Sequence, residues 1–357
     1  QTTVTALAQT VCKRAVKAFY ANVVHELGHV RASEVPTPTR FKDITGNEFE
    51  VHWIAACKKE LKNLQKYNVY TWVKRPPGVH LITGTWAFKC KSLDDGSIDK
   101  FKARICSQGF REVYGVHFLE VSAPVGKLKT FRQMMAEAAR RGMQVSLRDI
   151  SSAYLTAPLD VDIYMEPPEG TREIDGDSGH HGEVWKLNRA LYGLRQSGRV
   201  FHLRFRKQLL HKFGFKASAA DNCLFIKRRG KSKLQLLVFV DDICITNDAT
   251  ADGRALRQEF EQNIADEGYE FSPCDDDHVY LGVAINRVND TVISLSQERY
   301  ITDVMIKYGF MSKDLQMLKK PTRSPSPSGK GKVLIEDCPQ KDPSENKLGR
   351  RYREYCG

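Results

Sequence analysis

The sequence predicts an α+β fold in which antiparallel hairpins are combined with amphipathic helices. Residues 234–246 (LQLLVFVDDICIT) form an apolar, β-branched run with two acids in the middle, a pattern typical of two buried strands and a tight turn. Residues 85–110 predict a second hairpin, because two alternating segments flank an Asp-Asp-Gly turn. Helices are expected around 54–64, at 128–141, within 184–213, and around 256–264 and 300–308.

The composition favours a globular protein with an anionic partner. The 357 residues are 41% apolar, which is enough for a core, and the length suggests two or three domains. Lysine and arginine outnumber the acids by 55 to 43, and the net charge of +12 suits nucleic acid, although an anionic membrane surface would fit the charge as well. No apolar run approaches a membrane-spanning length and no leader is recognisable, so we expect an intracellular protein without a membrane partner.

Asp241 and Asp242 are expected at the tip of the 234–246 hairpin. An isolated buried carboxylate is costly, and two carboxylates about 4 Å apart repel by about 4 kcal/mol at an effective dielectric near 20. The pair therefore takes up a proton or a cation, and hard oxygen ligands favour Mg²⁺ or Mn²⁺. The alternative is a solvated turn, as expected for Asp94–Asp95 and Asp275–Asp277, but only Asp241 and Asp242 have apolar runs on both sides.

A zinc site is the competing hypothesis for the N-terminal segment. Residues 4–30 predict an amphipathic helix whose last turns contain His25, Glu26 and His29, the H-E-x-x-H pattern of zinc metalloproteases. At about 100° per residue, both histidines fall on the face expected to meet solvent. The extended spacing with a third histidine does not follow either, so a metalloprotease is the least favoured function.

Two further stretches carry candidate functional residues. The 85–110 hairpin is basic, so one of its faces can pack while the other offers cations to phosphates; an exposed ribbon without a ligand is the alternative. Its cations are Lys89, Lys91, Lys100, Lys102 and Arg104. A strand beginning at residue 144 should deliver Asp149 at its end, although this residue could also cap a helix.

Eight short motifs follow one another along the chain. They are TWAFK at 85–89, KAR at 102–104, DISSAYL at 149–155, IYMEPPEG at 163–170, LYGLRQS at 191–197, FVDD at 239–242, YLG at 280–282, and Gln297 with Tyr300. Their order resembles the reverse transcriptase of copia-type retrotransposons. The likeness runs from about Trp53 to Phe310, and eight blocks in the family's order are more specific than any one of them.

This resemblance implies a right-hand polymerase fold, with fingers and a palm built on an antiparallel sheet. Asp149, Asp241 and Asp242 would converge in the palm and hold two Mg²⁺ ions, with Mn²⁺ as a substitute. The activity would be that of an RNA-directed DNA polymerase, which uses an RNA template, a DNA primer and deoxynucleoside triphosphates. Such a protein would act in a cytoplasmic particle and in the nucleus.

The resemblance also implies roles for four other residues and a division of the chain. Lys102 and Arg104 would contact the incoming triphosphate, and Gln196 would help to position nucleotide and template. Tyr154 would lie beneath the sugar, unless it is a core aromatic. Residues 1–46 would be a helix and linker, 47–310 the fingers and palm, and 311–357 a connection toward a ribonuclease H domain.

Two positions depart from the family pattern. Phe239 replaces the usual tyrosine before V-D-D, which removes only a hydroxyl. Gly198 replaces the usual proline, which loosens the turn expected to place Gln196. A catalytically inactive, nucleic-acid-binding remnant is therefore the second hypothesis for the function. His180 and His181 are expected to be solvated in a surface loop.

Overall fold

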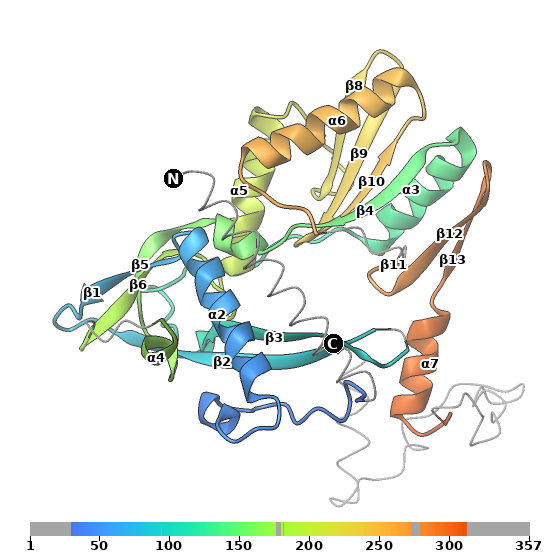
Figure 1. Cartoon of the computed structure of the whole chain (residues 1–357). Coiled ribbons are helices and arrows are strands. Elements are labelled where there is room, and N and C mark those ends of the chain that lie inside the picture. The colour runs from blue at the N-terminus through green and yellow to red at the C-terminus, as the bar shows by residue number, and fades with distance from the viewer. Residues whose placement is uncertain (1–29, 94, 176–179, 181, 273–278, 313–357) are drawn as a thin grey trace, which may run out of the picture. The chain divides into compact units, whose positions relative to one another are not determined.

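The computed structural model describes residues 30–93, 95–175, 180, 182–272 and 279–312 (Figure 1). The chain divides into two compact units, Gln1–Ser296 and Gln297–Gly357. Helix α7 (Glu298–Lys307) is the described helix of the second unit. The predicted N-terminal helix, with its His25–His29 motif, and nearly all of the predicted 311–357 connection lie outside the described residues.

The first unit contains a five-stranded sheet in the order β1-β6-β5-β2-β3. Its strands are β1 (Tyr70–Lys74), β2 (Leu81–Ser92), β3 (Ile98–Ser107), β5 (Pro158–Glu166) and β6 (Glu183–Arg189). The hairpin predicted at 85–110 is confirmed as the antiparallel pair β2 and β3, whereas β2 and β5 are parallel.

Helix α2 (Glu50–Lys66) packs across this hairpin, chiefly against β3 (Figure 1). Its Trp53 is fully buried, and its ring meets the edges of Phe88 and Phe101 at centroid distances of 5.6 and 4.8 Å. Aromatic contacts of this kind add to the free energy gained by burying apolar surface, so they hold the helix against the hairpin. The helix predicted around 54–64 is therefore confirmed.

A second five-stranded sheet, in the order β4-β10-β9-β8-β7, is antiparallel throughout. Its strands are β4 (Gln144–Asp149), β7 (Lys216–Ala217), β8 (Leu224–Arg229), β9 (Ser232–Phe239) and β10 (Asp242–Asn247). The 234–246 hairpin is confirmed as β9 and β10. Both of its faces are buried, because Leu236 packs into one core cluster and Leu237 into another, and this explains its continuous apolar sequence.

Helices cover both faces of this second sheet. Helices α5 (Ser197–His211) and α6 (Ala251–Asp266) share a core with one face. Helix α3 (Leu128–Arg141) covers the other face with a small sheet of β11 (Val279–Tyr280), β12 (Val283–Asn289) and β13 (Val292–Ser296). The short helices are η2 (Phe41–Ile44), η3 (Gly109–Arg111), η4 (Ala153–Thr156) and α4 (Thr171–Asp175). Within the described ranges, none of the helices has the length and hydropathy needed to span a bilayer.

Candidate active site

The three predicted aspartates lie together at one end of the second sheet. Asp149 ends β4 and pairs directly with Asp242, the first residue of β10, so the sheet register itself brings the two carboxyls together. Asp241 lies in the turn between β9 and β10, and its carbonyl accepts a hydrogen bond from the Ile150 N–H at 2.9 Å. The prediction that Asp149 ends a strand is confirmed.

The turn that carries Asp241 has an unusual backbone. Val240 adopts φ of +57°, in the left-handed region that a β-branched residue rarely enters. Such a conformation costs of order 1–3 kcal/mol and persists only where the surrounding structure enforces it. The buried strands β9 and β10 supply that constraint, and they fix the direction in which the turn presents Asp241.

Ser272 fixes the position of Asp149 and was missed by the sequence analysis. Its hydroxyl donates to Asp149 Oδ1 at 2.7 Å, and its N–H donates to the Asp149 carbonyl at 2.9 Å. Ser151 lies in the same network, with its hydroxyl 2.9 Å from that of Ser272. No sequence motif marks Ser272, because it lies 123 residues beyond its partner.

The carboxyls of this site repel one another. Burial, and then the neighbouring Asp149, raise the pKa of Asp241. Burial, with Asp241 and Asp149 nearby, raises the pKa of Asp242 to about 6. Over the described part of the chain, no three His, Cys, Asp or Glu side chains lie close enough to form a ready metal site. The aspartates are thus adjacent and crowded, but their side chains do not yet form a closed ligand set.

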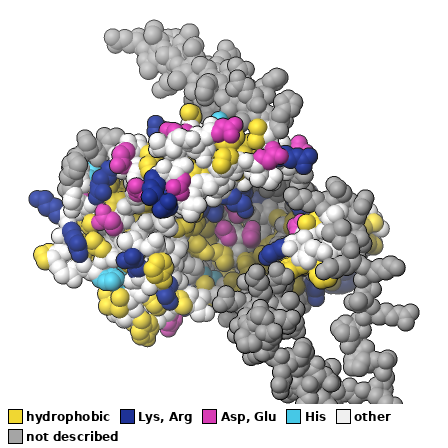
Figure 2. All heavy atoms as spheres, turned by 90° about the horizontal axis from the view of Figure 1, so that it is seen from below, with side chains coloured by type: hydrophobic (Ala, Val, Ile, Leu, Met, Phe, Trp, Pro, Cys, Tyr) yellow, Lys and Arg dark blue, Asp and Glu magenta, His cyan; other side chains and the backbone are white. Residues whose placement is uncertain are grey.

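The aspartates open into a cleft of about 900 Å³. The opposite wall of the cleft comes from α2 and β3, with Lys59, Lys62 and Lys66 from the helix and Lys100, Lys102 and Arg104 from the strand. Seen from below the view of Figure 1, acidic side chains lie in a hollow bordered by lysine and arginine side chains (Figure 2). Acids on one wall therefore face cations on the other.

Lys102 and Arg104 hold defined positions in the basic wall. Burial, and then the neighbouring Arg104, lower the pKa of Lys102. The Arg104 guanidinium lies 4.9 Å from the ring centroid of Tyr192, an arrangement that favours a cation over an aromatic face. Both predicted cations thus line the cleft that contains the aspartates.

Glu60 is a further cleft residue that the sequence analysis missed. It is 8% exposed, it lines the cleft, and its Oε1 accepts the Ile105 N–H at 3.2 Å. Burial raises its pKa to about 7, against the opposing effect of Arg104 and Lys102. A signal was available, because Glu60 falls within the apolar stripe of α2, three residues after the buried Cys57.

The other two predicted site residues do not line the cleft. Gln196 is 3% exposed and donates to the His117 carbonyl at 3.1 Å, while its Oε1 is buried without a partner among the described residues. Tyr154 is half-buried, with its ring 5.7 Å from that of Tyr192 and 6.4 Å from that of Phe201. Their roles toward nucleotide and sugar stay predictions.

The remaining predictions concern Gly198 and the paired histidines. An added Cβ at Gly198 would lie 3.8 Å from the Tyr154 hydroxyl, an ordinary contact, so this position tolerates a side chain. His180 is half-buried rather than fully solvated, because its ring stacks on Trp72 at 4.6 Å and its Nδ1 bonds to Glu183. His181 lies outside the described residues.

Comparison with known proteins tests the sequence resemblance directly. The family model for reverse transcriptase (RNA-dependent DNA polymerase) matches residues 67–320. The chain belongs to this family. The reverse transcriptase domain is 34% identical over 297 residues to the retrovirus-related Pol polyprotein from transposon RE1 of Arabidopsis thaliana, and 28% identical over 313 residues to that from transposon TNT 1-94 of Nicotiana tabacum. The predicted likeness to retrotransposon polyproteins is confirmed.

These relatives are much longer than the domain. The two alignments cover 82% and 87% of this chain but 19% and 22% of the relatives. Among solved structures, the foamy viral protease-reverse transcriptase in complex with dsDNA is similar with a TM-score of 0.40 and 14% identity, over 71% of this chain and 43% of that one.

Proposed function

We propose that this reverse transcriptase domain is an active RNA-directed DNA polymerase that extends a primer 3′-hydroxyl with deoxynucleoside triphosphates. The observation that carries the proposal is the opposition, across one cleft, of Asp149, Asp241 and Asp242 and the cations Lys102 and Arg104. In this assignment the second sheet with its helices is the palm, and the first sheet with α2 forms the fingers. RNA and DNA strands and nucleotides are the proposed partners.

The basic wall suits the triphosphate. Arg104 offers several N–H donors in a fixed plane held over Tyr192, a geometry that matches phosphate oxygens, and Lys102 adds a point charge. Because Lys102 is half-buried among other cations, an arriving polyanion relieves their mutual repulsion. Binding there would direct the α-phosphate toward the aspartates across the cleft.

The aspartate wall suits Mg²⁺. Crowded carboxylates with raised pKa values gain most from a divalent cation, and their hard oxygens are the ligands that this ion prefers. Asp149, Asp241 and Asp242 would hold the metal, with Asp149 oriented by Ser272. Bound Mg²⁺ would lower the pKa of the primer hydroxyl and neutralise charge on the phosphates.

Primer extension tests the proposal. Wild-type protein should extend a DNA primer on an RNA template when Mg²⁺ or Mn²⁺ is present. Asp149→Asn and Asp241→Asn should each abolish extension and leave template binding largely unchanged, because they remove carboxylates rather than phosphate contacts. Asp160→Asn, at an exposed position of β5, is the matched control and should extend normally.

The assay also separates the active enzyme from an inactive remnant. Binding of primer–template without extension in any metal would identify a remnant and refute the proposed activity. Extension at the wild-type rate by either aspartate variant would refute the assignment of the site.

A further inference from the structure

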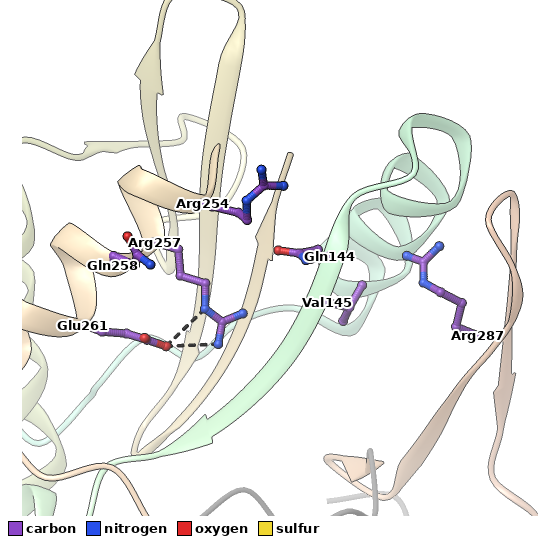
Figure 3. A pocket seen from close by; sticks show the side chains of 7 residues that line it. All are labelled: Gln144, Val145, Arg254, Arg257, Gln258, Glu261 and Arg287. Atoms are coloured by element: carbon purple, nitrogen blue, oxygen red, sulfur yellow. Dashed lines mark hydrogen bonds and ion pairs between the residues drawn. The ribbon is translucent and has the colours of Figure 1, made fainter. Parts of the chain in front are cut away.

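A second pocket, of about 510 Å³, lies at the other end of β4 from Asp149. Three elements line it: the start of β4 with Gln144 and Val145, helix α6 with Arg254, Arg257 and Glu261, and strand β12 with Arg287 (Figure 3). The two α6 arginines lie on one side of β4, and Arg287 reaches the strand from the other side, where its guanidinium donates to the Met143 carbonyl (Figure 3).

The charges of this pocket are unbalanced. Among its described lining residues, Glu261 is the one carboxylate, and it already accepts Arg257 Nε and Nη2 at 3.1 and 3.0 Å. The Arg254 and Arg287 guanidinium groups donate to main-chain carbonyls, including that of Ala249, which carry no full charge. A guanidinium has five N–H donors, so both of these exposed arginines keep donors for a ligand.

The pocket chemistry favours phosphate over a peptide carboxylate. Planar guanidinium groups match phosphate oxygens in pairs. Val145 is the one apolar side chain among the described lining residues, so an acidic peptide would find little apolar surface to anchor it.

The pocket is separate from the catalytic cleft. Gln144 lies five residues before Asp149 on one strand, about 16 Å away at roughly 3.3 Å per residue. That separation corresponds to roughly five nucleotides of a strand at about 3.4 Å each. A primer–template that extends more than about five nucleotides beyond the aspartates is therefore long enough to reach this pocket.

We infer that Arg254 and Arg287 bind backbone phosphates of nucleic acid outside the catalytic cleft, so that the protein holds its primer–template at two places. The inference rests on the proposed nucleic-acid partner, but not on polymerase activity. Arg257 serves a positioning role, because it joins Glu261 to the Ser146 hydroxyl of β4.

The salt dependence of binding tests this inference. Each phosphate contact that is lost should reduce the slope of log affinity against log salt by about one, which is about tenfold in affinity at roughly 0.1 M salt. We therefore expect Arg254→Ala and Arg287→Gln each to lower the slope by about one and the double variant by about two. Arg287 is replaced by glutamine because the glutamine amide can still donate to main-chain carbonyls that the guanidinium contacts, such as that of Asp290. The measurement is fluorescence anisotropy of a labelled primer–template in the full chain, with thermal melting as a check of folding.

Controls separate this pocket from general surface charge. Arg132→Ala, at an exposed position of α3, should leave the slope unchanged; an equal loss there would overturn the inference. A wild-type slope in the double variant would also overturn the inference. So would a loss of affinity for inorganic triphosphate without a loss of affinity for nucleic acid. Failure of the wild-type protein to bind primer–template would instead refute the proposed function.

Discussion

Replacing Glu60 by glutamine should stabilise the protein above neutral pH. Glu60 is 8% exposed, and burial raises its pKa to about 7, whereas a glutamate in an unfolded chain titrates near about 4.3. The folded state therefore binds the proton of the Glu60 carboxyl more tightly than the unfolded state does. The stabilising contribution of protonated Glu60 to the free energy of unfolding is fully present below about pH 4 and is lost as the pH rises through 7.

The magnitude follows from the same two pKa values. At about 1.4 kcal/mol for each pH unit between them, ionising Glu60 costs the folded state at most about 3 to 4 kcal/mol. The glutamine oxygen can still accept the Ile105 N–H, so the substitution leaves no donor unpaired. Glu60→Gln and wild type should therefore be equally stable near pH 4, and the variant should be up to about 3 kcal/mol more stable near pH 8.

Urea unfolding at a series of pH values, followed by circular dichroism, measures this difference. Glu48→Gln is the matched control, since Glu48 is exposed just before the same helix, and its stability profile should follow that of wild type. Parallel profiles for Glu60→Gln and wild type between about pH 5 and 8 would refute the reasoning, because they would show that the buried carboxyl carries no free-energy cost.

Two other substitutions test the surroundings of the aspartates. If the Tyr154 ring excludes a 2′-hydroxyl, Tyr154→Val should raise ribonucleotide incorporation relative to deoxynucleotide incorporation by more than tenfold, or about 1.4 kcal/mol. Unchanged discrimination between the two sugars, together with a lower Tm, would instead assign the ring to packing against Phe201. Gly198→Ala should raise the free energy of unfolding by about 0.5–1 kcal/mol, since the first turn of α5 has room for a Cβ; a destabilised variant in thermal melting would contradict this reading of the turn.

The sequence by itself determined the local elements and the identity of the acidic residues. Alternation with a period of two and an apolar run broken by Asp241 and Asp242 predicted both hairpins, because strand pairing across a short turn depends on neighbouring residues alone. The strand end at Asp149 was predicted in the same way. The order of motifs identified the family, since each block preserves a local pattern.

Only the tertiary structure decided what surrounds those residues. The hydroxyl of Ser272 reaches Asp149 across 123 positions of the chain, and α2 carries Glu60 to β3 from 45 positions away. The burial of Gln196, which donates to the His117 carbonyl, and the gathering of arginines around the start of β4 likewise depend on how distant elements pack. The apolar stripe of α2 marks Glu60 as buried, but it does not identify the partner on β3. Which distant groups meet leaves no periodic trace in the sequence, because it depends on side-chain shape and sheet order rather than on spacing along one segment.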